Sequence, residues 1–281
     1  MFDVTRLLTQ RLTQDLRSSY ERTYGSQDAS VPEIASWAAD LALENIARSD
    51  ATYHNVEHTV MVTSVGIELL RCLHLNRGGV SPRDWLHVIV ALLCHDIGYV
   101  RGICQADRIG RWTDGLGGTI ELAPGATDAA LMPWHVDRGM AFVRERFHRT
   151  KEIDAERVAG CIDYTRFPVP SDPAWHETGS LRGLVRASDL IGQLGDPHYL
   201  RKIPALFHEL RENHAQQGFD SPADMRARYP EFFERQVQPW IGDAIALLGV
   251  TATGRAWISS LDAHVYEAER LMCTTVDDSD L

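Results

Sequence analysis

Two short stretches of the sequence gather the residue types that bind divalent metal ions. TYHNVEHTV (residues 52–60) holds His54 and His58 four positions apart, and ALLCHDIGY (residues 91–99) places His95 beside Asp96 at the end of an apolar run. Imidazole nitrogens and carboxylate oxygens are what borderline or hard divalent cations take as ligands. A carboxylate next to a buried run needs a partner that offsets its lost hydration, and a cation is one such partner.

A third stretch supplies a further carboxylate. In LVRASDLIGQLGDP, Asp189 interrupts an otherwise apolar helical pattern. Together with His58, His95 and Asp96 it would form a mixed nitrogen and oxygen site with coordination positions open to water, as metal hydrolases require. If a helix already includes residue 54, the side chains of His54 and His58 lie on one face of it. The alternative for these two histidines alone is a surface or capping pair.

The order of these motifs, H, then HD, then D, resembles the HD superfamily of metal-dependent phosphohydrolases. Within it, YHNVEH is similar to the Y-H-N-x-x-H signature of the class I cyclic nucleotide phosphodiesterases. Three later stretches also resemble that family in the right order, namely WHVDRGMAFVRERF, CIDYTRFP and RASDLIGQLGDP. The resemblance covers about residues 50 to 200 and implies a compact helical bundle of the HD-domain type.

The resemblance also implies roles for individual residues. His58, His95, Asp96 and Asp189 would hold one metal ion, and Asp96 could bridge to a second. A cation lowers the pKa of bound water, so the expected reaction is attack of an activated water on phosphorus. His54 would protonate the leaving oxygen, which suits an imidazole with a pKa near neutrality. The alternative for His54 is a residue at a helix start, bonded to a backbone carbonyl.

The sequence departs from the phosphodiesterases in two places. Tyr99 of HDIGY stands where that family has a second histidine, and PWHVD lacks the family's glutamate but offers His135. His135 is thus expected either in the outer shell or as a direct ligand of a second metal. One or two ions of magnesium, manganese, zinc or iron fit these residues. A di-iron HD oxygenase and a non-catalytic HD sensor are the alternatives to hydrolysis.

Two further regions are candidates for contact with substrate. The Gly-rich stretch 101–133 lacks helical periodicity, and a long loop in a compact domain is usually functional or disordered. It predicts a lid, or phosphate contacts from Arg101, Arg108 and Arg111, with a surface insertion as the alternative. A base pocket is expected in YPEFFERQVQPW, where the candidates are Phe232, Phe233, Gln236 and Gln238. The expected substrate is a small phosphoester, first a phosphodiester such as a cyclic nucleotide, and next a nucleotide monoester or an alarmone.

Almost every long segment outside that loop has a helical pattern of apolar residues, and no alternating strands with hairpin turns stand between them. In SPRDWLHVIVALLCHD, for example, Ser81 is a candidate N-cap followed by Pro82 and Asp84 in the first turn. The sequence therefore predicts an all-α single domain. Packing helices occupy 1–50, the HD core 51–200, and helices that complete the same domain 201–281.

Composition limits the partners and the compartment. The formal net charge of −11 disfavours association with a nucleic-acid polymer or an anionic membrane. Five scattered cysteines without a C-x-x-C pair indicate a reducing compartment, and we expect a cytoplasmic protein. The first residues contain no long apolar run, so neither a signal peptide nor a membrane span is expected there. The sequence leaves open whether the chain forms a homodimer.

Overall fold

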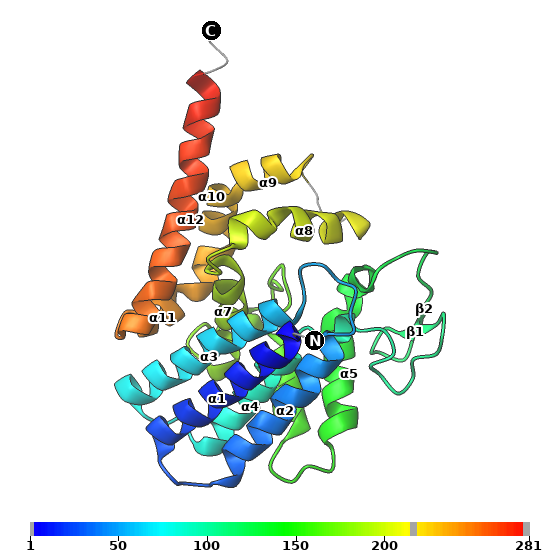
Figure 1. Ribbon diagram of the computed structural model, residues 1–281, viewed down its shortest axis with the longest axis vertical. Coiled ribbons are helices and arrows are strands. Elements are labelled where there is room, and N and C mark those ends of the chain that lie inside the picture. The colour runs from blue at the N-terminus through cyan, green and yellow to red at the C-terminus, as the bar shows by residue number, and fades with distance from the viewer. Residues whose placement is uncertain (1–2, 214–217, 278–281) are drawn as a thin grey trace.

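The protein is described from a computed structural model over residues 3–213 and 218–277, with side chains described as far as residue 270. It is a compact all-α bundle (Figure 1), which confirms the predicted fold class. Strand structure in the described part is confined to one short hairpin, β1 (Trp112–Thr113) and β2 (Thr119–Ile120).

The N-terminal part of the bundle surrounds one apolar cluster. It consists of α1 (Val4–Tyr24), α2 (Ser30–Ile46), α3 (Val56–Arg77), α4 (Pro82–Cys94), η1 (Ile97–Tyr99), η2 (Asp128–Trp134), α5 (His135–Phe147) and α6 (Ala155–Asp163). Leu12, Leu16 and Trp85 are fully buried in this cluster. Burial of such side chains contributes about 1.5 to 3 kcal/mol each, so this cluster holds α4 firmly in the centre.

The C-terminal part surrounds a second apolar cluster. It consists of η3 (Pro173–Trp175), α7 (Leu181–Leu194), α8 (Tyr199–Glu212), α9 (Pro222–Ala227), α10 (Tyr229–Phe232), η4 (Phe233–Val237), α11 (Gln238–Leu248) and α12 (Ala252–Asp277). The far end of α12 extends away from the remainder of the bundle (Figure 1). The pair α3 and α7 belongs to both clusters, because Val62 and Val185 face the first while Val65 and Leu184 face the second.

Helices α3 and α7 approach closely because α7 carries a glycine at their contact. A Cβ atom on Gly192 would lie only 2.6 Å from Cα of Val62, a separation that real Cβ atoms do not adopt. The two helices therefore pack backbone to backbone at this point. Asp189 lies one turn before Gly192 and His58 one turn before Val62, so the same close contact brings two predicted ligands together.

The capping residues decide where the helices that carry the motifs begin. The side chain of Asn55 accepts hydrogen bonds from the backbone N–H groups of Glu57 and His58, and α3 begins at Val56. His54 therefore precedes the helix, so the condition for a shared helical face with His58 is not met. At α4 the prediction is confirmed, because Ser81 and Asp84 form a capping box with proline at the first position.

The stretch 101–133 is folded rather than featureless. It contains the hairpin and η2, and the hairpin lies at the edge of the molecule beside α5 (Figure 1). Arg138 of α5 is completely buried and holds the stretch in place. Its guanidinium donates to the carboxylate of Asp107. It also donates to three backbone carbonyls, those of Gly98, Val100 and Thr113. Every nitrogen of this guanidinium is paired, which offsets the cost of burying its charge.

Four of the five cysteines lie within the described side chains, and all four are buried and unpaired. Cys273 lies outside them. None of the helices in the described part of the chain has the length and apolar character that a membrane span needs.

Candidate metal centre and active site

The four predicted metal ligands meet between the two apolar clusters. His58 stands in the first turn of α3, His95 and Asp96 directly follow α4, and Asp189 lies in the middle of α7. Nε2 of His58 lies 3.2 Å from Nε2 of His95, and each of these nitrogens lies 3.5 Å from Oδ1 of Asp189. Oδ2 of Asp96 is 3.1 Å and 3.0 Å from the same two nitrogens. Nε2 of each histidine and one carboxylate oxygen of Asp189 thus lie close enough together to hold one metal ion, and Oδ2 of Asp96 lies beside both nitrogens.

The hydrogen bonds around these groups suit a cation at that point. Nδ1 of His95 lies 2.7 Å from the carbonyl oxygen of Leu92 and donates to it, which leaves the lone pair of Nε2 directed at the other ligands. Oδ2 of Asp96 is buried without a hydrogen-bond partner, although two imidazoles lie beside it. Two neutral imidazoles and two carboxylates carry a charge of −2, which a divalent ion would balance. The residues present therefore fit a metal ion.

Buried charges of opposite sign govern the protonation of these groups. Burial opposes the charged form of His95, but the charges of Asp96 and Asp189 outweigh it and hold its pKa well above the ordinary value. The pKa of His58 is raised by the same balance. Burial disfavours ionised Asp96, yet the charge of His95 and the close approach of both imidazoles hold its pKa well below the usual range. A cation bound here would replace protons on the imidazoles.

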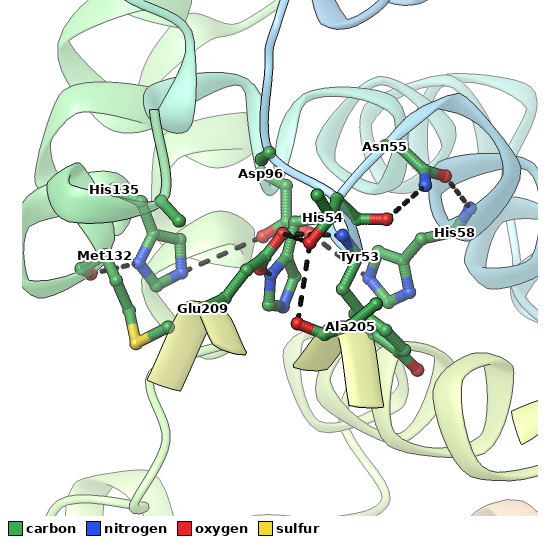
Figure 2. Close-up of polar contacts among 12 residues, drawn as sticks. Tyr53, His54, Asn55, His58, Asp96, Met132, His135, Ala205 and Glu209 are labelled. Carbon is green, nitrogen blue, oxygen red and sulfur yellow. Dashed lines mark hydrogen bonds and ion pairs between the residues drawn. The ribbon is translucent and has the colours of Figure 1, made fainter. Parts of the chain in front are cut away.

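His135 faces the other oxygen of Asp96. Its Nδ1 lies 2.5 Å from the carbonyl oxygen of Met132 and donates to it, and its Nε2 lies 3.8 Å from Oδ1 of Asp96 (Figure 2). Burial lowers the pKa of His135, so the ring favours its neutral form. The close approach of α5 depends on Gly98, where a Cβ atom would lie 1.9 Å from the carbonyl oxygen of His135. Asp96 thus has one oxygen toward the His58 and His95 pair and one toward His135, an arrangement that could hold a second ion.

His54 is hydrogen-bonded to a carboxylate that sequence reasoning missed. Its Nδ1 lies 2.5 Å from Oε2 of Glu209, which reaches across from α8 (Figure 2). Oε1 of Glu209 accepts from the backbone N–H of Tyr53, so the carboxylate fixes both the main chain and the ring. The alternative expectation is that His54 bonds a backbone carbonyl. In the structure the partner of its Nδ1 is the carboxylate of Glu209 instead. Glu209 lies in a segment with a helical pattern of apolar residues, and nothing in its local sequence marks it as a partner of His54.

Tyr99 lies between two of the imidazoles. Its ring stacks on His54 with centroids 4.7 Å apart and on His135 with centroids 4.6 Å apart. Burial raises the pKa of Tyr99 well above its ordinary value, so the hydroxyl keeps its proton. Tyr99, which stands where the phosphodiesterases have a histidine, therefore packs between the two imidazole rings and fixes their positions.

A cavity of about 310 Å³ opens beside these residues. Its wall includes His54, Asp96, Tyr99, His135 and Asp189. Thr165 of the CIDYT stretch and Gln193 of α7 also line it, and sequence reasoning gave neither a role. Most of the remaining wall is apolar or aromatic and comes from α8, α9 and α10.

The substrate-binding candidates meet the cavity only in part. Phe232 lines it, whereas the adjacent Phe233 packs into the second apolar cluster and against the ring of Tyr229. Gln236 and Gln238 are exposed and are not among the residues of the wall. The short turns of α10 and η4 rotate these glutamines outward, so their placement in a base pocket is wrong. Gln193 is the glutamine that the fold brings to the cavity.

The three arginines of the 101–133 stretch also lie elsewhere. Arg101 pairs with Asp50 and Asp128, and Arg111 with Glu121 at the exposed hairpin. Arg108 is exposed and bonded to nearby backbone carbonyls. Met132 is the member of this stretch that lines the cavity. None of these three arginines is among the residues of the cavity wall.

Comparison with known proteins gives one match. A family model described as Npun_R2479-like matches residues 2–271. The chain belongs to this family. Neither the curated proteins nor the solved structures contain a match to the chain. The description of the family states no chemistry, so the function has to be inferred from the geometry of the site.

Proposed function

We propose that this chain is a metal-dependent phosphohydrolase that cleaves a phosphodiester. One observation carries the proposal. Ligand atoms of His58, His95 and Asp189 lie together, with a carboxylate oxygen of Asp96 beside the two histidines, next to a cavity whose wall includes His54. A cation held by these residues would lower the pKa of a water molecule and offset charge on the phosphoryl oxygens.

His54 and Glu209 supply the proton that hydrolysis needs. The bond between Nδ1 and the carboxylate leaves Nε2 as the ring nitrogen free to carry and donate a proton. When water attacks phosphorus and the ester P–O bond breaks, the departing oxygen takes this proton. The carboxylate of Glu209 fixes the tautomer and the orientation of the ring, as a carboxylate does for a catalytic histidine.

The experiment that tests the proposal combines metal analysis with turnover. Protein purified without chelators is analysed for bound metals and then assayed against a panel of phosphodiesters, with the His58→Ala variant as the control for contaminating activity. We expect one or two divalent ions per chain and metal-dependent release of a monoester. Full metal content without cleavage of any diester would contradict the proposal.

Dioxygen activation at two irons is a second candidate, supported by the position of His135. Its Nε2 is directed at the oxygen of Asp96 that the other two histidines do not contact. This candidate predicts two irons per chain and oxygen consumption with an organic substrate. Oxygen consumption separates the two candidates, because hydrolysis needs no change in the oxidation state of the metal.

A further inference from the structure

The cavity beside the metal centre has a polar part and an apolar part. His54, Asp96, His135 and Asp189 make up the polar part. The apolar part is formed chiefly by Leu206, Leu210, Phe219, Met225, Tyr229 and Phe232, which come from α8, the segment before α9, α9 and α10. A volume of about 310 Å³ is at the lower end of the range for small-molecule sites, about 300 to 1,000 Å³. The ligand is therefore modest in size, with a substantial apolar surface.

The charges of the wall favour a ligand with a single negative charge. Among the described residues that line the cavity there is no lysine or arginine. A substrate with several phosphates would need cationic partners for the groups that lie beyond the metal centre. The nearest candidate by sequence is Arg166, which stands between the wall residues Thr165 and Phe167 and is paired with Asp137 and Asp163. A nucleoside polyphosphate or an alarmone would leave phosphate charges unpaired against an apolar wall.

The supply of hydrogen bonds in the cavity is also small. The side chain of Gln193 already bonds the hydroxyl of Tyr199, and the hydroxyl of Thr165 donates to the carbonyl of Ile162. The hydroxyl of Tyr229 is buried and has no partner, so it is available for one hydrogen bond to a ligand. A nucleobase carries several donors and acceptors on its edges, and those left unpaired in this cavity would weaken its binding. An aryl or alkyl group has no such requirement.

We propose that this cavity selects phosphodiesters with one negative charge and an apolar or aromatic ester group, in preference to nucleotides. The inference rests on the proposed function, because it takes the phosphoryl group to lie at the metal centre. It replaces the cyclic nucleotide that the sequence resemblance suggests with a different substrate class. The apolar wall then contacts the ester group that does not leave.

Three substrates with the same leaving group test this selection. Phenyl, methyl and thymidine 5′ esters of 4-nitrophenyl phosphate each carry one negative charge and release nitrophenolate, so they differ only in the retained group. With metal-replete full-length protein, we expect kcat/KM for the phenyl ester to exceed that for the methyl ester by about tenfold or more, because the ring is transferred from water to an apolar wall. The thymidine ester should gain no such advantage. A preference for the thymidine ester, or equal values for all three, would overturn the inference.

Two adjacent phenylalanines provide matched variants. Phe232 lines the cavity and Phe233 does not, so Phe232→Ala should reduce the ratio of phenyl to methyl kcat/KM severalfold. Phe233→Ala should leave that ratio unchanged. Equal effects of the two substitutions on the ratio would contradict the assignment of the cavity.

A binding measurement keeps the inference separate from the proposed function. Diphenyl phosphate and dimethyl phosphate are compared by calorimetry on the metal-replete protein. If none of the nitrophenyl esters is cleaved, the proposed function fails. Tighter binding of diphenyl phosphate, weakened by Phe232→Ala, would still support the apolar selection, and equal or absent binding of the two diesters would reject it.

Discussion

Nδ1 of His54 lies 2.5 Å from Oε2 of Glu209, although the two residues are 155 positions apart in the chain. His54 is placed by the start of α3 and Glu209 by the third turn of α8, so the pair forms only when the C-terminal helices close over the core. The glutamate acts through the histidine, which makes it a positioning residue. Its effect can be measured independently of the metal ligands.

Replacing Glu209 by Gln should slow hydrolysis while leaving the metal in place. Glutamine has one acceptor oxygen in place of two, so it cannot accept hydrogen bonds from both the backbone N–H of Tyr53 and Nδ1 of His54 as the carboxylate does, and the ring loses its fixed orientation. We expect a loss in kcat for a diester with a poor leaving group of about tenfold, less than for removal of the acid itself, and a much smaller loss for a nitrophenyl ester, whose leaving group needs no proton. Equal losses on both substrates, or metal loss in the variant, would mean that Glu209 has only a structural role.

Glu209→Gln should also change how the free energy of unfolding depends on pH. Burial disfavours the charged form of Glu209, but its hydrogen bond with His54 outweighs this and lowers its pKa below 4.5. A carboxylate with a lowered pKa stabilises the fold above its unfolded pKa and loses this contribution as pH falls through the folded value. The wild type should therefore exceed Glu209→Gln in free energy of unfolding at pH 6, and the difference should shrink below about pH 4.5. Urea titrations across this range measure it. A difference that stays constant with pH would contradict the linkage.

Replacing Asp96 by Ala should abolish metal binding. The change removes a buried oxygen that lies 3.0 Å and 3.1 Å from two imidazole nitrogens, and also the oxygen toward His135. Asp189→Ala should retain part of the metal, because Asp96, which has one oxygen toward His58 and His95 and the other toward His135, remains in place. Metal content of the folded variants, with circular dichroism to confirm folding, gives the answer. Full occupancy in Asp96→Ala would remove this residue from the ligand set.

Replacing His54 by Ala should separate proton donation from metal binding. His54→Ala should keep the metal and lose about 10² to 10⁴-fold in kcat for an alkyl leaving group, whereas His58→Ala should lose the metal. The loss should be much smaller for a nitrophenyl ester, because nitrophenolate departs without protonation. Equal losses on both substrates, or loss of metal from His54→Ala, would show that this histidine is not the acid.

Replacing Gly192 by Ala should destabilise the fold at the contact that brings α3 and α7 together. Alanine favours a helix over glycine by about 1 kcal/mol, but here its Cβ would lie 2.6 Å from backbone of Val62. Overpacking of this kind costs about 1 to 3 kcal/mol, so the clash should outweigh the helix preference and lower the free energy of unfolding. Metal affinity should also fall, because Asp189 shifts. Gly242→Ala is the matched control, because nothing lies within 4 Å of a Cβ there and the helix preference alone should raise the melting temperature. A stabilised Gly192→Ala would show that the helices separate freely.

Local patterns in the sequence were sufficient for the helical class and for the residues that gather at the centre. Helical periodicity and capping depend on neighbours along the chain, as at Ser81 and Asp84, so the start of α4 was predictable. Ligand chemistry depends on residue type, and His58, His95, Asp96 and Asp189 were therefore recognisable as a group by their side chains and their order along the chain. The side-chain partners of these residues depend on other helices, and these were not predictable.

Tertiary structure alone determined which groups surround that centre. Glu209 is an ordinary acidic residue on an amphipathic helix until α8 packs beside His54, and Tyr99 is one more aromatic residue until it lies between two imidazoles. The same holds for the cavity wall, where Phe232 faces inward and Phe233 does not, although both have the same side chain. Orientation around a short helix, and pairing across 155 positions, follow from long-range packing, which no local sequence pattern encodes.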